Sequence, residues 1–175
     1  MNQKAILAAI AVPLLLAVPA AAQAQKYPVK PIRMIVGYAP GGGSDIMGRL
    51  MAQQITEALG QQVIVENRAG AAQNVAAEYI AKQPADGYTL FLSSAALGVN
   101  ISLYPKLNYH PERDFAPVAV FATAPNLLLV HPSFPAKNVR ELIALAKGRP
   151  GEVNYSSPGF GTNPQMGMEL FLFMT

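Results

Sequence analysis

Apolar residues follow two different periods along the chain, which predicts strands followed by helices. The run from Ile32 to Tyr38 is continuous, rich in β-branched residues and bounded by prolines, which favours a strand buried on both faces. After Gly41–Gly43, apolar residues recur at helical spacing from Met47 to Leu59, and Gly60 is placed to end the helix. This order of strand, glycine loop and helix is typical of an α/β unit.

The same order recurs further along the chain. Residues 62–66 predict a second strand, residues 74–82 a helix and residues 88–94 a third strand. Strands alternating with helices predict a doubly wound parallel sheet that is covered on both faces. Ligands bind such sheets at the carboxyl ends of the strands. The glycine loop and Ser93–Ser94 both fall at that edge.

The later part of the chain predicts the beginning of a second unit. Residues 98–117 carry three prolines and predict an irregular segment, which two closely spaced apolar runs follow at 118–132. A helical stripe from Val139 to Ala146 predicts a helix that ends at Gly148. Residues 153–157 predict another strand, which is followed by a small-residue loop and a further helix. The repeated arrangement suggests two lobes that offer equivalent surfaces to something between them.

The first residues have the pattern of an export signal. Lys4, an apolar stretch and the small residues ending at Ala24 predict a signal peptide over residues 1–24, with cleavage after Ala24 and a periplasmic mature protein. The chain has no cysteine, which excludes a disulfide framework and a thiolate metal site. Its formal net charge of +3 is spread along the sequence, so no nucleic-acid partner is expected.

The glycine loop has the chemistry of an anion site. A helix N-terminus carries unpaired N–H groups, and glycines allow an anion to approach the backbone. Nucleotide motifs do not fit, because Arg49 and Leu50 stand where a P-loop requires lysine and a hydroxyl residue, and Ile46 breaks the dinucleotide pattern. The simpler alternative is a tight turn without a ligand, with Asp45 stabilising its own helix and Ser44 as the N-cap. A carboxylate here would also repel a highly charged ligand unless the ligand carries an amine or Asp45 points away.

Catalytic motifs are scarce. His110 and His131 each precede a proline, where the backbone is extended and loop-like. No HExxH or GxSxG motif occurs, and Ser156 and Ser157 have no base nearby in the sequence. These serines are better hydrogen-bond donors than nucleophiles, and no cofactor is expected.

Several ordered motifs resemble one family. The stretches "YPVKPIRMIVGYAPGGGSD", "VENRAGA", "PADGYTLFLSS" and "NLLLVHPSFPAKNVRELIALAKGRPGEVNYSSPGFGT" are similar to the solute-binding proteins of the tripartite tricarboxylate transporter system, the Bug or TctC family. The resemblance runs from about Tyr27 to Phe171. It implies a non-enzymatic, type II periplasmic-binding-protein-like α/β fold of two lobes, which closes on a small organic acid and presents it to membrane transporter subunits.

The resemblance also divides the chain and places the site. It implies a first lobe over residues 25–125, the start of a C-terminally truncated second lobe over residues 126–175, a hinge near residues 126–130 and a monomer when complete. Similar proteins hold a carboxylate largely through backbone amides and ordered waters of the matching loops. The substrate-binding residues expected on this basis are Tyr38, Pro40, Gly41, Gly42, Gly43, Asp45, Ser93, Ser94, Ser156, Ser157, Gly159, Gly161 and Thr162.

Departures from the family pattern concern the ligand rather than the class. Ala69, Ala72 and Gln73 stand where the family often has proline and glycines, and Gln165 stands where many relatives carry histidine. Two alternatives remain open at this point. The first is a secreted serine-dependent hydrolase or transferase, which requires a histidine within reach of Ser93, Ser94, Ser156 or Ser157. The second is a binding protein that docks on a sensory receptor. We also expect residues 25–175 alone to bind weakly or to aggregate, because apolar residues of an incomplete lobe lack partners.

Overall fold

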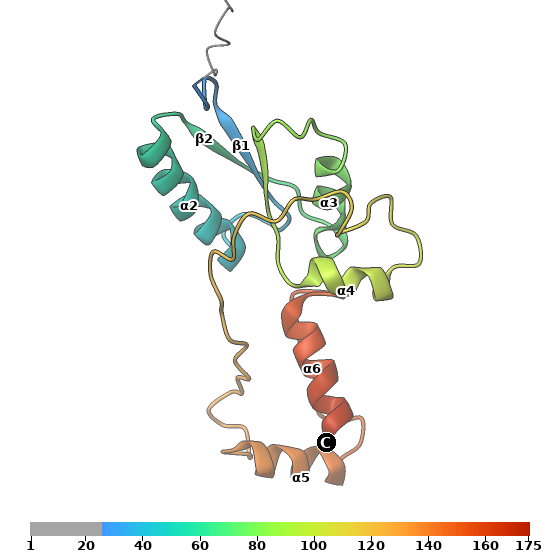
Figure 1. Cartoon of the computed structure of the whole chain (residues 1–175). Coiled ribbons are helices and arrows are strands. Elements are labelled where there is room, and N and C mark those ends of the chain that lie inside the picture. Colours follow the sequence, from blue (N-terminus) through green and yellow to red (C-terminus); the bar gives the residue numbers. More distant parts are fainter. Residues whose placement is uncertain (1–25) are drawn as a thin grey trace, which may run out of the picture.

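The computed structural model describes residues 26–175, so the predicted signal peptide and its cleavage site lie outside the described residues. The first part is a three-layer α/β unit (Figure 1). Its elements are β1 (Ile32–Val36), α2 (Gly43–Leu59), β2 (Val63–Asn67), the 3₁₀ turn η2 (Ala71–Gln73), α3 (Asn74–Ile80), β3 (Thr89–Leu92) and α4 (Ala96–Leu103). The later helices are α5 (Val139–Gly148) and α6 (Asn163–Met174).

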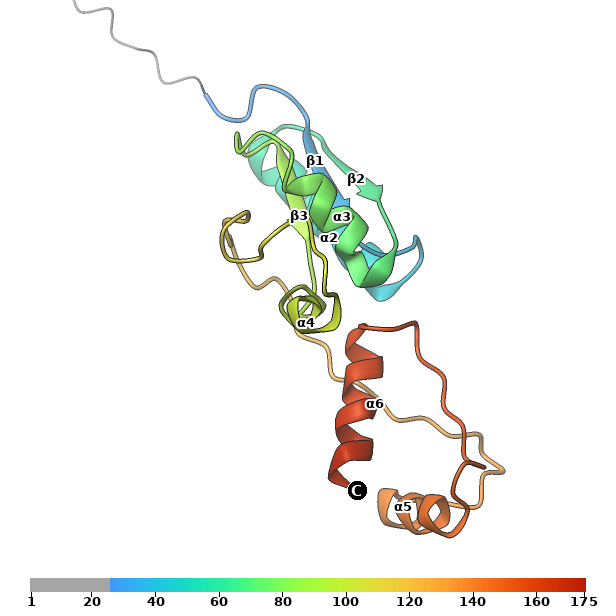
Figure 2. The ribbon, with the colours of Figure 1, turned by 90° about the vertical axis from the view of Figure 1, so that its right-hand side faces the viewer.

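The strands pair as predicted. Among the described residues they form one parallel sheet in the order β2–β1–β3, with Ile32 opposite Val63 and Arg33 opposite Thr89. Helix α2 packs on one side of the sheet and α3 on the other (Figures 1 and 2). Central strand β1 is therefore buried on both faces, and Met34, Ile35 and Val36 are almost fully buried. This confirms the expectation drawn from its uninterrupted apolar run.

Helix α2 ends where the sequence predicts but begins differently. Gly60 adopts the left-handed conformation with φ of 67°, and its amide donates to the carbonyl of Thr56 at 2.9 Å. This is a common glycine cap. The N-cap is Gly42 rather than Ser44, which lies inside the first turn and makes no cap hydrogen bond.

Two assignments from the sequence are corrected by the structure. Residues 96–103, part of which was expected to be irregular, form helix α4 because Ala96 and Asn100 are buried against the turn that contains Ala72. Residues 153–157 form no strand. A strand is stabilised by pairing with a neighbour, and within residues 26–175 no strand lies beside this segment.

The two later helices stand apart from the sheet. An extended segment leads from the α/β unit to α5, and α6 returns toward α4 with its N-terminal end nearest the sheet (Figures 1 and 2). Neither α5 nor α6 contains a buried residue. None of the helices in the described part of the chain is long and apolar enough to cross a membrane.

Candidate binding site

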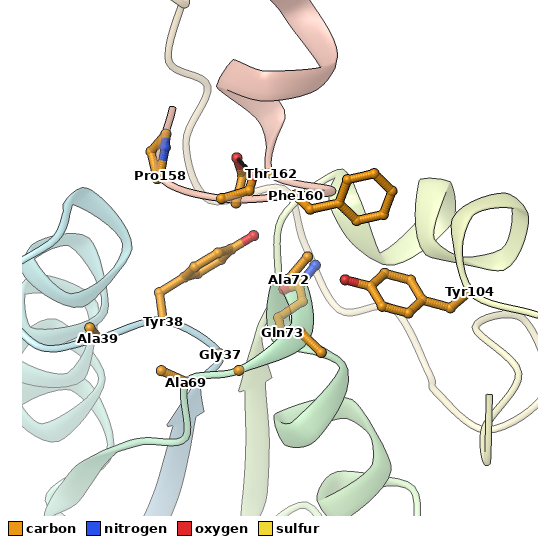
Figure 3. Close-up of a pocket in the computed structure, with 13 residues that line it drawn as sticks. Gly37, Tyr38, Ala39, Ala69, Ala72, Gln73, Tyr104, Pro158, Phe160 and Thr162 are labelled. Carbon is orange, nitrogen blue, oxygen red and sulfur yellow. Dashed lines mark hydrogen bonds between the residues drawn. The ribbon is translucent and has the colours of Figure 1, made fainter. Parts of the chain in front are cut away.

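A cavity of about 350 Å³ lies between the carboxyl edge of the sheet and the loop before α6. Figure 3 shows Tyr38 and Ala69 on the sheet side and Pro158, Phe160 and Thr162 on the opposite side. The volume falls in the range of small-molecule sites. The lining residues are Gly37, Tyr38, Ala39, Ala69, Gly70, Ala71, Ala72, Gln73, Tyr104, Pro158, Gly159, Phe160 and Thr162.

The loop after β2 forms much of the cavity wall. Its residues Ala71, Ala72 and Gln73 have φ values of 45°, 48° and 70°, so three consecutive non-glycine residues occupy the left-handed region. Each such residue is held at a conformational cost, which persists only where the surroundings fix the backbone. One fixing contact is the side chain of Asn100, which is fully buried and donates through Nδ2 to the carbonyl of Ala72 at 2.8 Å.

Gln73 supplies a second set of fixing contacts. Its fully buried side chain donates through Nε2 to the carbonyl of Ser94 at 3.1 Å and accepts the Ser94 amide at 3.0 Å. Ser94 Oγ in turn shares a hydrogen bond of 2.8 Å with the hydroxyl of Tyr38. The ends of β1 and β3 are thus tied to the loop after β2, and the network orients the Tyr38 ring that lines the cavity.

Close packing at Gly37 completes this arrangement. A Cβ atom placed on Gly37 would overlap the Cβ of Gln73, so glycine is required for the strand end to approach the loop. The expectation that glycine allows close approach at this edge therefore applies to Gly37. The partner that approaches is the protein's own backbone.

One amide of the glycine loop, that of Gly41, is already bonded within the protein. Asp45, which is only 4% exposed, accepts the Gly41 amide at 2.9 Å, the Arg49 Nε at 3.1 Å and the Asn67 Nδ2 at 2.9 Å. Hydrogen bonds from Arg49, from the Gly41 amide and from Asn67 lower the pKa of Asp45 to about 2. The carboxylate therefore lies in the first turn of α2, beside the loop where the sequence predicted an external anion.

The second loop is also partly capped by its own helix. Gly161 donates its amide to Gln165 Oε1 at 3.1 Å, and Thr162 Oγ1 donates to the carbonyl of Gly159 at 2.7 Å. Gly159 and Thr162 line the cavity, whereas Gly161 turns toward Ala72 and Asn100. This loop is thus the point at which the later part of the chain meets the α/β unit.

The structure therefore separates the thirteen residues expected at the site into three groups. Tyr38, Gly159 and Thr162 line the cavity, and Ser94 is hydrogen-bonded to the Tyr38 hydroxyl. Asp45, Gly41 and Gly161 make hydrogen bonds within the protein, as described above. The remaining residues lie outside the lining: Pro40, Gly42, Gly43, Ser93, Ser156 and Ser157.

Sequence reasoning missed the larger share of the wall. Residues 69–73 lie at the carboxyl end of β2, so the sheet-edge rule applied to them as well as to β1 and β3. Alanine carries no chemistry that draws attention, and the signal is the backbone conformation. Tyr104 and Phe160 were also missed: Phe160 lies between Gly159 and Gly161, which were expected at the site, whereas Tyr104 lies ten residues beyond Ser94.

The wall of the cavity is uncharged. None of the lining residues carries a charged side chain at neutral pH. The polar atoms of Gln73, Tyr38 and Thr162 are engaged by Ser94 or by Gly159. An anion here would be held by backbone dipoles and water rather than by an ion pair.

The histidines make local contacts. His110 Nδ1 accepts the amide of Glu112 at 3.3 Å, and His131 Nδ1 is hydrogen-bonded to Ser133 Oγ at 2.7 Å. Neither partner is one of the four serines that the hydrolase alternative requires. Among residues 26–175, no group of three or more His, Cys, Asp or Glu side chains is arranged to hold a metal ion.

Known proteins match this chain over almost its whole length. The family described as "Tripartite tricarboxylate transporter family receptor" matches residues 47–174. Protein BugT of Bordetella pertussis is 39% identical over 178 residues, which cover 100% of this chain and 55% of BugT. The chain thus spans about half the length of the curated relatives that it matches.

Solved structures give the same match. The structure of R. palustris Rpa4515 with adipate is 38% identical with a TM-score of 0.80, and MatC from Rhodopseudomonas palustris with bound malate is 31% identical with a TM-score of 0.74. Both alignments cover 85% of this chain, and they cover 50% and 51% of the other chains.

Proposed function

Because the chain belongs to the tripartite tricarboxylate transporter receptor family, we propose that it captures a small organic carboxylate in the periplasm and presents it to membrane transporter subunits. The proposal makes it a binding protein and not an enzyme. Two relatives support the ligand class, since one structure is described with adipate and another with malate.

The observation that carries the proposal is the position and character of the cavity. It lies at the carboxyl edge of a parallel sheet, where α/β proteins bind ligands, and a loop of the later segment faces it from the other side. Its walls are backbone-rich, since glycines and alanines supply seven of the thirteen lining residues. Such walls hold a ligand by amide dipoles and shape, as a reversible carrier requires.

The same arrangement supports a division of the chain into two lobes. We propose that residues 25–125 are the first lobe, that residues 126–175 open the second, and that residues 126–130 act as the hinge. Leu127 and Leu129 lie in an extended, exposed connection. Closure at the hinge would move the loop at Gly159 further toward the loop at Ala72. The two loops are already close to each other at Gly161.

A thermal-shift titration of the full chain tests carboxylate binding, with each acid raised to high concentration because residues 25–175 are expected to bind weakly. A ligand that binds only the folded state raises its stability by about 2.7 kcal/mol when present at 100 times its Kd. We expect a panel of organic acids to contain at least one that raises the melting temperature, while the corresponding neutral amide does not. A broad panel of aliphatic, aromatic and amino acids without any shift would contradict the proposal.

A matched pair of variants tests whether the bound group is an anion in this cavity. Ala69 lines the cavity at its exposed rim, so a longer side chain is accommodated there without entering the core. Ala69→Glu introduces a negative charge, and Ala69→Gln has nearly the same size without the charge. We expect the glutamate variant to weaken acid binding about tenfold more than the glutamine variant at low salt. The difference should shrink as ionic strength rises, and equal effects of both variants would contradict an anion in this cavity.

A further inference from the structure

An aromatic pair forms one wall of the cavity and comes from two distant parts of the chain. Tyr104 follows the last residue of α4, and Phe160 lies in the loop before α6. Their ring centroids are 6.1 Å apart at an interplanar angle of 71°, which is an edge-to-face arrangement. Figure 3 shows both rings on the same side of the cavity.

Much of the Phe160 ring is exposed to solvent although it packs against Tyr104. Its side chain remains 61% exposed although one edge meets Tyr104, so much of the ring is available to a ligand. Pro158 and Ala72 are further apolar residues of the lining, and Figure 3 shows Thr162 between Pro158 and Phe160. A bound molecule would remove this surface from water, which is favourable in proportion to the apolar area that both partners bury.

Few polar side chains that line the cavity are free to bind a ligand. The side chains of Gln73, Tyr38 and Thr162 already have partners within the protein, and no lining side chain is charged, which leaves the Tyr104 hydroxyl as a polar group that a ligand could engage. One ligand hydroxyl could pair with Tyr104, but a second carboxylate placed against Phe160 would lose its hydration without a charged partner. Burial of an unpaired polar group is costly, and burial of an unpaired charge is more so.

We infer that Tyr104 and Phe160 select for a carboxylic acid with an aromatic or unsubstituted hydrocarbon body, against hydroxylated di- and tricarboxylates. The inference rests on the proposed function, because it names which acids the same cavity accepts. The acid group lies toward the backbone of the two loops, and the apolar body lies against the aromatic pair.

Isothermal titration of the full chain with four acids tests this selection. Benzoate and hexanoate present an apolar body, whereas malate and citrate present hydroxyl and additional carboxylate groups. We expect the apolar acids to bind at least about tenfold more tightly. Equal affinity, or tighter binding of malate or citrate, would overturn the inference while leaving the proposed function intact. If no acid binds, the proposed function fails and the inference fails with it.

Variants of the aromatic pair assign the selection to these residues. Phe160→Ala should weaken binding of benzoate and hexanoate about tenfold and change malate binding less than about threefold. Phe160→Leu keeps an apolar side chain and should restore most of the affinity for hexanoate. Phe173→Ala is the control, because Phe173 is exposed outside the cavity and should alter neither. A uniform loss for all four acids in Phe160→Ala, with unchanged circular dichroism, would show that the pair shapes the loop rather than selecting the ligand.

Discussion

Residues 26–115 and residues 116–175 contain similar proportions of apolar side chains but bury them very differently. In the first region β1 is almost inaccessible to water, and α2 and α3 cover the two faces of its sheet. In the second region Val118 is 89% exposed and Leu129 is 80% exposed, and neither α5 nor α6 contains a buried residue. An apolar pattern therefore becomes a core only where a complementary layer lies next to it.

The difference in burial indicates that the two regions contribute differently to stability and to ligand binding. The first region contains the hydrogen-bond network that fixes the loop after β2, so this part of the cavity wall should keep its shape independently. The second region contributes Pro158, Phe160 and Thr162 to the cavity through one loop. We therefore expect the first region to set the global stability and the second to set the affinity.

The largest expected effect comes from two methionines in the two regions. Met34 is 1% exposed in β1, whereas Met174 is 75% exposed at the end of α6. Met34→Ala should destabilise the protein by about 2–5 kcal/mol, because it leaves a cavity in the core. Met174→Ala should change the unfolding free energy by less than about 0.5 kcal/mol. Urea unfolding of both variants measures this, and similar losses would mean that α6 is as tightly packed as the sheet.

A second pair of variants tests the close contact beneath the cavity. Gly37→Ala forces a methyl group against Gln73 and should cost about 1–3 kcal/mol through overpacking. Gly43→Ala is the control, because a Cβ atom at Gly43 meets nothing within 4 Å. Thermal unfolding should separate the two, and ligand affinity should fall only in the Gly37 variant. A neutral Gly37→Ala would show that the loop after β2 yields easily and is not held rigid.

The sequence predicted the first region well because its signals are local and its partners are near in the chain. The three strands, α2 and α3 were placed within about two residues, and Gly60 was correctly assigned as the cap. Helix α4 was missed because the prolines of residues 98–117 indicated an irregular segment, although all three follow the end of the helix at Leu103. Its helix depends on tertiary contacts of Ala96 and Asn100, which a local pattern does not reveal.

The site was only partly predictable for a related reason. The sheet edge follows from topology, and Tyr38, Gly159 and Thr162 were placed there from the sequence. The Gly41 amide was expected to face a ligand, but Asp45, four residues further along in the first turn of α2, accepts its hydrogen bond. The strand expected at residues 153–157 has no pairing partner, and no pattern within five residues contains that information.

Acid titration should reveal the Asp45 network in the first region. The pKa of Asp45 is lowered from its ordinary value of 3.8 to about 2, so ionised Asp45 stabilises the folded state. This contribution is present above pH 3.8 and is lost as the pH falls through about 2. Asp45→Asn should therefore lower stability at neutral pH and flatten the pH dependence between these values. Melting curves from pH 6 to pH 2 measure it, and parallel curves for both proteins would contradict the assignment.

Substitution of Asn138, the N-cap of α5, tests whether the two regions unfold together. Asn138 caps α5, accepting the Glu141 amide at 3.0 Å and donating to Glu141 Oε1 at 2.7 Å. Asn138→Ala should cost α5 about 1 kcal/mol, whereas Asn138→Ser keeps an acceptor for the Glu141 amide and should be nearly neutral. Hydrogen exchange should then accelerate about fivefold at α5 amides and remain unchanged in β1. If β1 amides lose protection to the same degree, the two regions form one cooperative unit, and burial alone does not divide the molecule.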